Sequence, residues 1–294
     1  MEVSLNSSVI IGQGSSNPLT ARRPGYGTMR LTGEGFFGEP ANRPEALRIL
    51  RKAVDLGVNY LDTADFYGHG VTNRLIAEAL HPYDSDLIIG TKIGAKRGDD
   101  KSWNVFSKPE ELRQSTDLNL KELKQEHLSL VHFRFRNDSD TAFEDSLETM
   151  FALQKEGKIL HVGLSNVSRE QVQIALDMGS IASVQNLYGY TQRTTLAGHT
   201  GGAGGEEVLD LLEQNQIPLI PYFSLHTAKG KKPGKIEEIA NKYRTTPAQM
   251  NIIWLLHKSA WILPIPGTTS MEHLVENLKA CKISLSPADI DYLG

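Results

Sequence analysis

Short apolar runs alternate with longer amphipathic runs along most of the chain, and this alternation predicts strands interleaved with helices. The amphipathic runs repeat apolar residues every three or four positions, which is the period of an α-helix. They span residues 44–57, 73–80, 108–123, 146–157, 169–179, 205–216, 246–259 and 271–280. The apolar runs are shorter and typical of buried strands, at residues 59–62, 86–92, 127–138, 159–165, 183–189, 218–223 and 261–267.

The number of repeats points to one fold class. About eight strand–helix units in roughly 270 residues favour an α/β protein built as a closed (β/α)8 TIM barrel, with eight parallel strands and outer helices, over an open doubly wound sheet. A G-x-G-x-x-G motif between a strand and a helix is absent from the sequence, and GHTGGAGG at 198–205 follows a long polar loop. We interpret 198–205 as a flexible loop, with a loop that folds over a cofactor as the alternative.

Composition narrows the range of partners. A net charge of −4 and a pI near 6.2 give no indication of nucleic acid or an anionic membrane as a partner. The lone cysteine, Cys281, excludes a disulfide within the chain, and we expect no metal site. The first 20 residues lack the pattern of a secretory signal, and no run reaches the ~18 apolar residues of a membrane span. We therefore expect a cytoplasmic protein that acts on a small molecule.

Polar side chains stand where the predicted strands end, which is where (β/α)8 barrels build their active sites. They are Asp62 with Tyr67, Lys92, His132 and Arg134, Ser165 with Asn166, Gln185 with Asn186, and Tyr222. Taken singly, each has an ordinary structural explanation, such as a capping aspartate or a surface lysine. Together, Asp62, Tyr67 and Lys92 predict a tuned general acid, because a lysine near a phenol lowers the pKa of the tyrosine.

Five motifs resemble the aldo-keto reductase superfamily in order and spacing. They are LDTADFYG, IGTKIG, GLSN, VQN and IPGTTSMEHLVEN. The resemblance runs from about Gly25 to the C-terminus. It implies one (β/α)8 barrel domain over 25–294, with residues 1–24 as an N-terminal arm or hairpin. The segments GYGTMRLTGEGFFGEP, TNRLIAEALHPY and KIGAKRGDDKSW are most similar to the pyridoxal reductase-like branch.

The resemblance also implies site residues. Asp62, Tyr67 and Lys92 match the catalytic aspartate, tyrosine and lysine of an NADPH-dependent carbonyl reductase that lacks a Rossmann fold. The implied cofactor-binding residues are Gly27, Thr28, Met29, Asp62, Ser165, Asn166, Gln185, Tyr222, Phe223, Ser224, Leu225, Gly267, Thr268, Ser270, His273, Glu276 and Asn277. Within this set, residues 165, 166 and 185 match those that hold the nicotinamide carboxamide, and residues 270–277 match the adenosine end.

The sequence departs from the family pattern at two places. Arg134 stands where the family carries its catalytic histidine, and His132 lies two residues earlier, roughly 6.6 Å deeper on the same face. We expect Arg134 to orient the substrate carbonyl, with His132 either beside it or bonded within the core. Thr268 and His273 replace a common lysine and arginine, so we favour NADPH and keep NADH as an alternative. The lysines of 227–233 suit either a solvated loop or the pyrophosphate.

The leading hypothesis is NADPH-dependent reduction of a small aldehyde or ketone, with Tyr67 as the proton donor. Pyridoxal is a candidate substrate by resemblance, and a biosynthetic ketone, enone or imine is a second. Because the chain ends soon after its last predicted helix, we expect an open site whose specificity depends on the loops 94–107, 135–142 and 189–205. The alternatives are a nucleotide-bound regulatory subunit with little turnover, or a redox-neutral lyase or isomerase on the same barrel.

Overall fold

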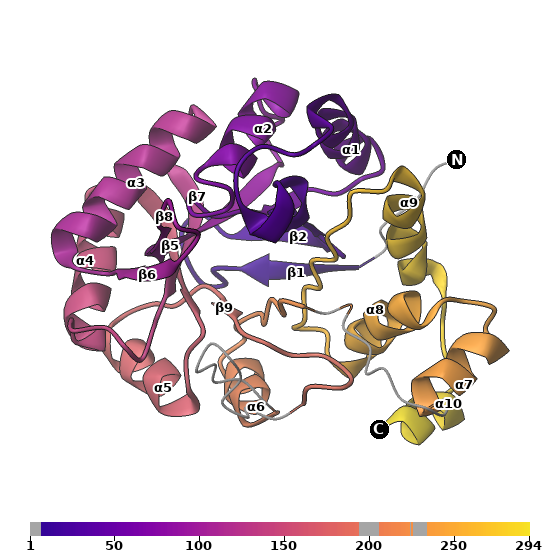
Figure 1. Cartoon of the computed structure of the whole chain (residues 1–294). Helices are drawn as coiled ribbons and strands as arrows, with labels where there is room; N and C mark the ends of the chain where they lie inside the picture. The colour runs from indigo at the N-terminus through magenta and orange to yellow at the C-terminus, as the bar shows by residue number, and fades with distance from the viewer. Residues whose placement is uncertain (1–6, 194–205, 224, 226–233) are drawn as a thin grey trace.

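The structure, a computed structural model, describes residues 7–193, 206–223, 225 and 234–294. The glycine-rich stretch 198–205, Ser224 and the lysines of 227–233 lie outside the described residues, so the predictions made for them are not taken further. Figure 1 shows α1 to α6 arranged around the strands, with the hairpin β1–β2 crossing the middle of the view.

Six parallel strands form a curved half-barrel in the order β3-β4-β5-β7-β8-β9. A further strand, β6, pairs with β5 in the antiparallel sense, and β1 pairs with β2 in a separate hairpin. The bounds are β1 Ser7–Ile11, β2 Leu19–Arg23, β3 Tyr26–Gly27, β4 Tyr60–Asp62, β5 Ile88–Arg97, β6 Trp103–Phe106, β7 Leu128–Arg134, β8 Ile159–Ser165 and β9 Val184–Gln185.

The predicted strands at 218–223 and 261–267 form isolated parallel bridges instead of continuous ladders. Leu219 bridges Val184 on one side and Ile262 on the other, and Tyr222 bridges Leu187. Both segments contain two prolines, which lack the backbone N–H that a ladder requires. Within the predicted strand at 183–189, the continuous ladder is limited to the two residues of β9.

The amphipathic runs form helices close to the predicted bounds, and several of them begin with a side-chain cap. Asn42 accepts from the Glu45 amide at the start of α1, and Thr246 forms a capping box with Gln249 at the start of α8. The helices are α1 Arg43–Asp55, α2 Val71–Leu80, α3 Pro109–Leu123, α4 Phe143–Lys155, α5 Arg169–Met178, α6 Glu206–Gln214, α7 Lys235–Lys242, α8 Pro247–Lys258, α9 Met271–Lys279 and α10 Pro287–Leu293, with short 3-10 turns η1 Met29–Leu31, η2 Glu34–Phe36 and η3 Ala280–Lys282.

The hairpin β1–β2 covers the amino-terminal end of the sheet. Val9, Ile11 and Ala21 of the hairpin pack in one cluster with side chains from the early part of several strands, including Tyr60 and Ile88. A larger cluster fills the space between the outer face of the sheet and the helices. The carboxyl end of the sheet is therefore the end at which a site forms. Within the described ranges, no helix is both long and apolar enough to cross a membrane.

Candidate active site

Three side chains predicted to act together meet where β4 ends and where the parallel part of β5 ends. The prediction that this strand ends at Lys92 was short, because β5 continues to Arg97 in an antiparallel pairing with β6. Lys92 Nζ donates to Asp62 Oδ1 at 2.6 Å and to the carbonyl of Thr63 at 2.8 Å. The same ammonium lies 4.7 Å from the centre of the Tyr67 ring. Lys92 and Asp62 are each only 2% exposed. Burial lowers the pKa of Lys92, and the charge of Asp62 opposes that change.

The pKa of Tyr67 moves in the direction opposite to the one we expected from the sequence. Burial, followed by the charge of Asp62, raises the pKa of Tyr67 well above its usual value. Arg134 is the cation that acts to lower it, a role that the sequence analysis had given to Lys92. Tyr67 is therefore a neutral phenol with an O–H to donate over the whole physiological pH range.

Strand β7 carries its two polar side chains at different depths. His132 is fully buried, bonds Ser183 Oγ through Nε2 at 2.9 Å, and does not line the cavity described below. Burial, with the charge of Lys92, lowers the pKa of His132 to about 3, so its ring is neutral. Arg134 is half-buried, lines the cavity and lies 5.9 Å over the ring of Tyr222. Of the two polar side chains of β7, Arg134 lines the cavity and His132 does not.

A cavity of about 710 Å³ opens at this end of the sheet. It is lined by Gly27, Met29, Arg30, Phe36, Asp62, Phe66, Tyr67, Lys92, Trp103, Arg134, Arg136, Asn137, Asp138, Gln185, Tyr222, Phe223, Leu225, Ile265, Pro266 and Gly267. It thus joins the predicted catalytic groups to part of the predicted cofactor set. The sequence analysis did not single out Phe36 or Phe66, whereas Trp103 and Arg136–Asp138 fall in the loops 94–107 and 135–142.

Aromatic side chains form one wall of the cavity. Phe66 meets Tyr67 edge to face at a centroid distance of 5.4 Å and Trp103 at 5.6 Å. Trp103 belongs to β6, and its ring lies 4.3 Å from the guanidinium of Arg97 on β5. Arg97 also donates to the carbonyl of Gly35 at 3.3 Å. This guanidinium therefore ties the hairpin β5–β6 to η2, and it holds Trp103 against the cavity.

Two buried polar atoms beside the cavity lack a partner within the part of the chain that the structure describes. They are Ser165 Oγ and Gln185 Oε1, at the ends of neighbouring strands that pair in register. Gln185 donates its Nε2 to Asp62 Oδ1 at 2.8 Å, which fixes the orientation of its amide. Tyr222 donates its hydroxyl to Asn166 Oδ1 at 3.3 Å. A group that both donates and accepts hydrogen bonds, such as a carboxamide, would satisfy the two orphaned atoms.

The residues predicted for the adenosine end lie along the start of α9. Ser270 caps this helix by accepting from the His273 amide at 3.3 Å, and Thr268 Oγ accepts from the Ser270 amide at 3.0 Å. His273 is exposed and Asn277 is buried. Glu276 is half-buried and lies on the same helix. None of these residues lines the cavity, so the structure separates them from the catalytic groups.

Gly27 and Thr28, at the end of the first parallel strand, make close contacts with neighbouring backbone. A Cβ on Gly27 would lie 2.7 Å from the carbonyl oxygen of Ile265, and one on Gly267 would lie 2.5 Å from that of Gly27. Thr28 is buried and donates to the carbonyl of Asp62 at 2.8 Å. These contacts bring the first strand end close to the segment 264–267 on the cavity wall.

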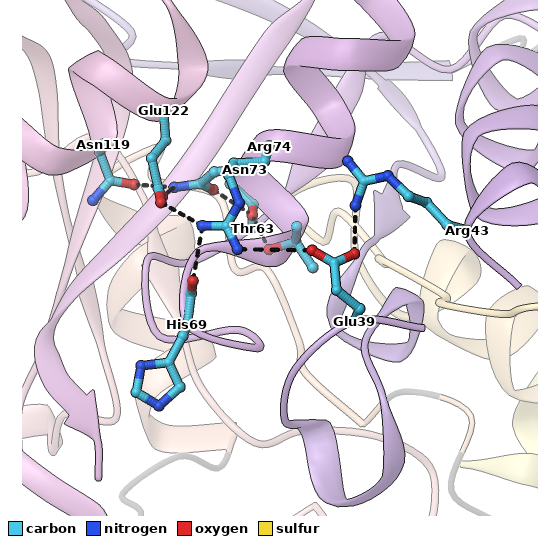
Figure 2. Close-up of polar contacts among 9 residues, drawn as sticks. Glu39, Arg43, Thr63, His69, Asn73, Arg74, Asn119 and Glu122 are labelled. Atoms are coloured by element: carbon cyan, nitrogen blue, oxygen red, sulfur yellow. Dashed lines mark hydrogen bonds and ion pairs between the residues drawn. The ribbon is translucent and has the colours of Figure 1, made fainter. Parts of the chain in front are cut away.

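A buried polar network on the helix side of the sheet links the strands that carry Asp62 and Lys92 (Figure 2). Thr63 Oγ1 donates to Asn73 Oδ1 of α2 at 2.8 Å, and Asn73 Nδ2 donates to Asn119 Oδ1 of α3 at 2.9 Å. Thr91 Oγ1 donates to the same Asn119 oxygen at 2.7 Å. Thr63 follows Asp62 and Thr91 precedes Lys92, so the neighbours of the catalytic pair are tied together from behind.

The network continues to the surface through charged side chains. Arg74 Nη1 donates to Glu122 Oε1 at 2.7 Å and to the carbonyl of His69 at 2.9 Å. Its other terminal nitrogen lies 3.9 Å from Glu39, which also pairs with Arg43 (Figure 2). The loop that carries Glu39 is thereby held against the start of α2.

Comparison with known proteins agrees with this geometry. The sequence profile described as "Aldo/keto reductase family" matches residues 25–294. The pyridoxine 4-dehydrogenase of Escherichia coli (strain K12) is 39% identical over 282 residues, which cover 92% of this chain and 95% of that protein. The solved structure of a thermostable aldo-keto reductase, Tm1743, in complex with epalrestat is 26% identical with a TM-score of 0.79, over 97% of this chain and 98% of that one.

A further solved structure shares the fold at lower identity. An aldo/keto reductase from Klebsiella pneumoniae, solved in complex with NADP and acetate, has a TM-score of 0.76 at 23% identity, over 98% of this chain and 94% of that chain. The family profile spans nearly the whole chain, and the E. coli relative matches along almost its full length. The chain therefore belongs to the aldo/keto reductase family, and it is an NAD(P)H-dependent oxidoreductase.

Proposed function

We propose that this protein reduces a small aldehyde or ketone with NADPH, and that Tyr67 is the proton donor. The observation that carries the proposal is the buried Asp62–Lys92 pair beside the neutral Tyr67 phenol, inside a cavity of about 710 Å³. A phenol in this position donates its O–H to the carbonyl oxygen of a substrate as negative charge develops there. Asp62 holds Lys92 in place, and Lys92 and Arg134 stabilise the phenolate that remains.

The polar atoms near the cavity suit a nicotinamide cofactor. The unpartnered Ser165 Oγ and Gln185 Oε1 match a carboxamide, and the half-buried Tyr222 offers a ring face for stacking. When bound, the reduced nicotinamide supplies the hydride. At the other end, the α9 amides and the Ser270 hydroxyl are donors for a 2′-phosphate. We favour NADPH on family membership, with NADH as the alternative.

We also propose that the half-barrel closes into an eight-stranded (β/α)8 barrel, preceded by an arm over residues 1–24. The bridges Val184–Leu219 and Leu219–Ile262 continue the sheet, and Gly25 N donates to the carbonyl of Pro264 at 2.9 Å. These contacts add two segments, 218–222 and 261–265, between β9 and β3. Cytoplasmic location stays a prediction.

Pyridoxal is the first substrate to test, because the E. coli relative carries the name pyridoxine 4-dehydrogenase. The experiment follows NADPH oxidation at its absorbance with pyridoxal and with a panel of aromatic aldehydes. We expect turnover, and we expect Tyr67→Phe to abolish it while the Kd for NADPH stays within about twofold. Tyr83→Phe is the matched control, since its hydroxyl donates to the Leu123 carbonyl at 2.6 Å outside the cavity.

The same assay separates the alternatives. Tight NADPH binding with no consumption of cofactor by any carbonyl would favour a regulatory subunit. Conversion of a substrate without net oxidation of NADPH would favour a lyase or isomerase. Turnover by Tyr67→Phe at a rate near that of the unaltered protein would show that another group donates the proton.

A further inference from the structure

Arg134 is a charged group without a counter-charge at the centre of the site. Within the described ranges its guanidinium has neither a hydrogen bond nor an ion pair, and its contact is the ring of Tyr222 at 5.9 Å. A guanidinium carries its charge at every physiological pH and presents a planar fork of donors. Half-burying such a group without a partner is unfavourable, so the free site favours an anion that completes it.

The charges on the cavity wall add to this imbalance. The lining contains four cationic side chains, Arg30, Lys92, Arg134 and Arg136, and two carboxylates. Both carboxylates are engaged, because Asp62 pairs with Lys92, and Asp138 accepts from Arg136 Nε at 2.9 Å and from Arg136 Nη2 at 2.7 Å. The unmatched positive charge is therefore on Arg134 inside the cavity and on the exposed Arg30 at its rim.

The position of Arg134 restricts where an anion lies relative to the reacting carbonyl. Lys92 pairs in register with His132, and Arg134 lies two residues further along β7 with its side chain on the same face of the sheet. The guanidinium is therefore a neighbour of the ammonium that lies 4.7 Å from the Tyr67 ring. A carbonyl oxygen that accepts from Tyr67 therefore places its nearest substituents beside Arg134. On a six-membered ring, the position next to the carbonyl-bearing carbon is the nearest to Tyr67 and therefore to Arg134, and the position across the ring is the farthest.

The walls next to Arg134 are aromatic. The ring of Tyr222 lies 5.9 Å from the guanidinium. Phe66 and Trp103 also line the cavity, in contact with each other at a centroid distance of 5.6 Å. Flat ring systems gain most from such walls, through stacking and edge contacts. The site thus combines a slot for an aromatic ring with one cation beside the carbonyl position.

We propose that the substrate is an aromatic aldehyde with an anionic oxygen ortho to the carbonyl, and that Arg134 is the residue that selects it. This inference rests on the proposed carbonyl reduction and names the substrate class for it. Phenolate and carboxylate share the required chemistry, and pyridoxal, with a hydroxyl beside its formyl group, belongs to the class. Arg134 then serves as both the recognition group and a donor close to the carbonyl.

A binding measurement tests selection without depending on turnover. The protein saturated with NADP⁺, which cannot reduce an aldehyde, is titrated calorimetrically at a pH above the pKa of the hydroxybenzaldehydes, where they are phenolates. The ligands are 2-hydroxybenzaldehyde, 2-carboxybenzaldehyde, their 4-substituted isomers and 2-methoxybenzaldehyde. We expect each ortho anion to bind about 10- to 100-fold more tightly than its para isomer or the neutral methoxy compound. This ratio falls to within about twofold of unity in Arg134→Met, and Arg134→Lys restores part of it.

Arg113→Met is the control, since Arg113 is paired with Glu156 and does not line the cavity, and the ortho preference persists in it. Equal binding of ortho and para anions by the unaltered protein would overturn the proposal. So would an Arg134→Met variant that weakens NADP⁺ binding while keeping the ortho preference, because Arg134 would then serve the cofactor. Whether the phenolate or the carboxylate gives the larger ratio identifies the anion.

The kinetic counterpart separates this inference from the proposed function. The ratio of kcat/KM between ortho and para isomers, measured with NADPH, follows the ratio of binding constants when both hold. Ortho-selective binding that depends on Arg134, without NADPH oxidation, would leave the inference standing and refute carbonyl reduction. Turnover of all the aldehydes without an ortho preference would do the reverse.

Discussion

The polar network behind the strands gives a prediction that separates catalytic alignment from stability. Asn119 Oδ1 accepts hydrogen bonds from both Thr91 and Asn73. The substitution Asn119→Leu therefore removes the link between Thr91 of β5, which precedes Lys92, and Asn73 of α2, which binds Thr63. Both amide groups and both threonine hydroxyls of the network are fully buried. Water therefore has little access to replace the lost acceptor.

The magnitude follows from the contacts. The Thr91 hydroxyl loses the oxygen that accepts its hydrogen bond, and Asn73 keeps a longer bond of 3.3 Å to Glu122. The substitution leaves the Thr91 hydroxyl without an acceptor and the Asn73 amide with a weaker one. We expect this change to lower the free energy of unfolding by about 2–4 kcal/mol. For a chain of this size that is a fall in Tm of roughly 3–7 °C. Because Asp62 and Lys92 lose their common support, we expect kcat to fall about 10- to 100-fold.

The assay is thermal unfolding together with NADPH oxidation at saturating substrate. Asn251→Leu is the matched control: Asn251 is equally buried, and its Nδ2 donates to the carbonyl four residues earlier, as that of Asn119 does. We expect this control to lower Tm and leave kcat within about twofold. An Asn119→Leu variant with lowered Tm and unchanged kcat would refute the alignment argument. Equal losses of kcat in both variants would refute it as well.

Three further predictions concern titration and the cofactor. Burial raises the pKa of Asp65 to about 8, so its carboxyl stays protonated in the folded protein at pH values where it ionises in the unfolded chain. The free energy of unfolding therefore falls as pH rises from about 4 to about 8. Asp65→Asn should flatten this dependence in denaturant titrations. The pKa of His132 is lowered to about 3, so its contribution is lost as pH falls from 6.5 towards 3; His132→Gln should unfold at lower pH than the unaltered protein, while the kcat profile above pH 6 keeps its shape. His273→Arg should raise the kcat/KM ratio of NADPH over NADH about 10-fold, because a guanidinium binds a 2′-phosphate more strongly; an unchanged ratio would place the phosphate elsewhere.

Periodicity and strand-end polarity were enough to predict much of the fold and part of the site. Asp62, Lys92 and Arg134 were found because parallel strands bring their carboxyl ends to one edge, whatever the packing around them. The depth of His132 followed from the two-residue repeat of a strand. These features depend on local spacing, which a sequence displays directly.

The features that the sequence analysis missed depend on tertiary contacts or on short elements. The residues of β6 lie in a polar stretch that resembles a loop, and α7 and α10 are too short for a clear helical period. The predicted direction of the Tyr67 pKa shift was wrong because burial, which the sequence does not display, raises this pKa more than the charge of Arg134 lowers it. The pairing of Asn73 with Asn119 joins two helices, and neither residue stands out in its own helix.

Strand β5 has consequences for how this protein diversifies. Gly94, with a φ of +106°, divides the strand into a part that ends with Lys92 and a part that runs into the hairpin with β6. The first part is anchored through Thr91 to α3, and the second is fastened by Arg97 to Trp103 and η2. Replacements beyond Gly94 therefore change which molecules fit the cavity without moving the Asp62–Lys92 pair. Evolution, or a protein engineer, can alter the substrate range on one half of the strand while the acid chemistry stays fixed on the other.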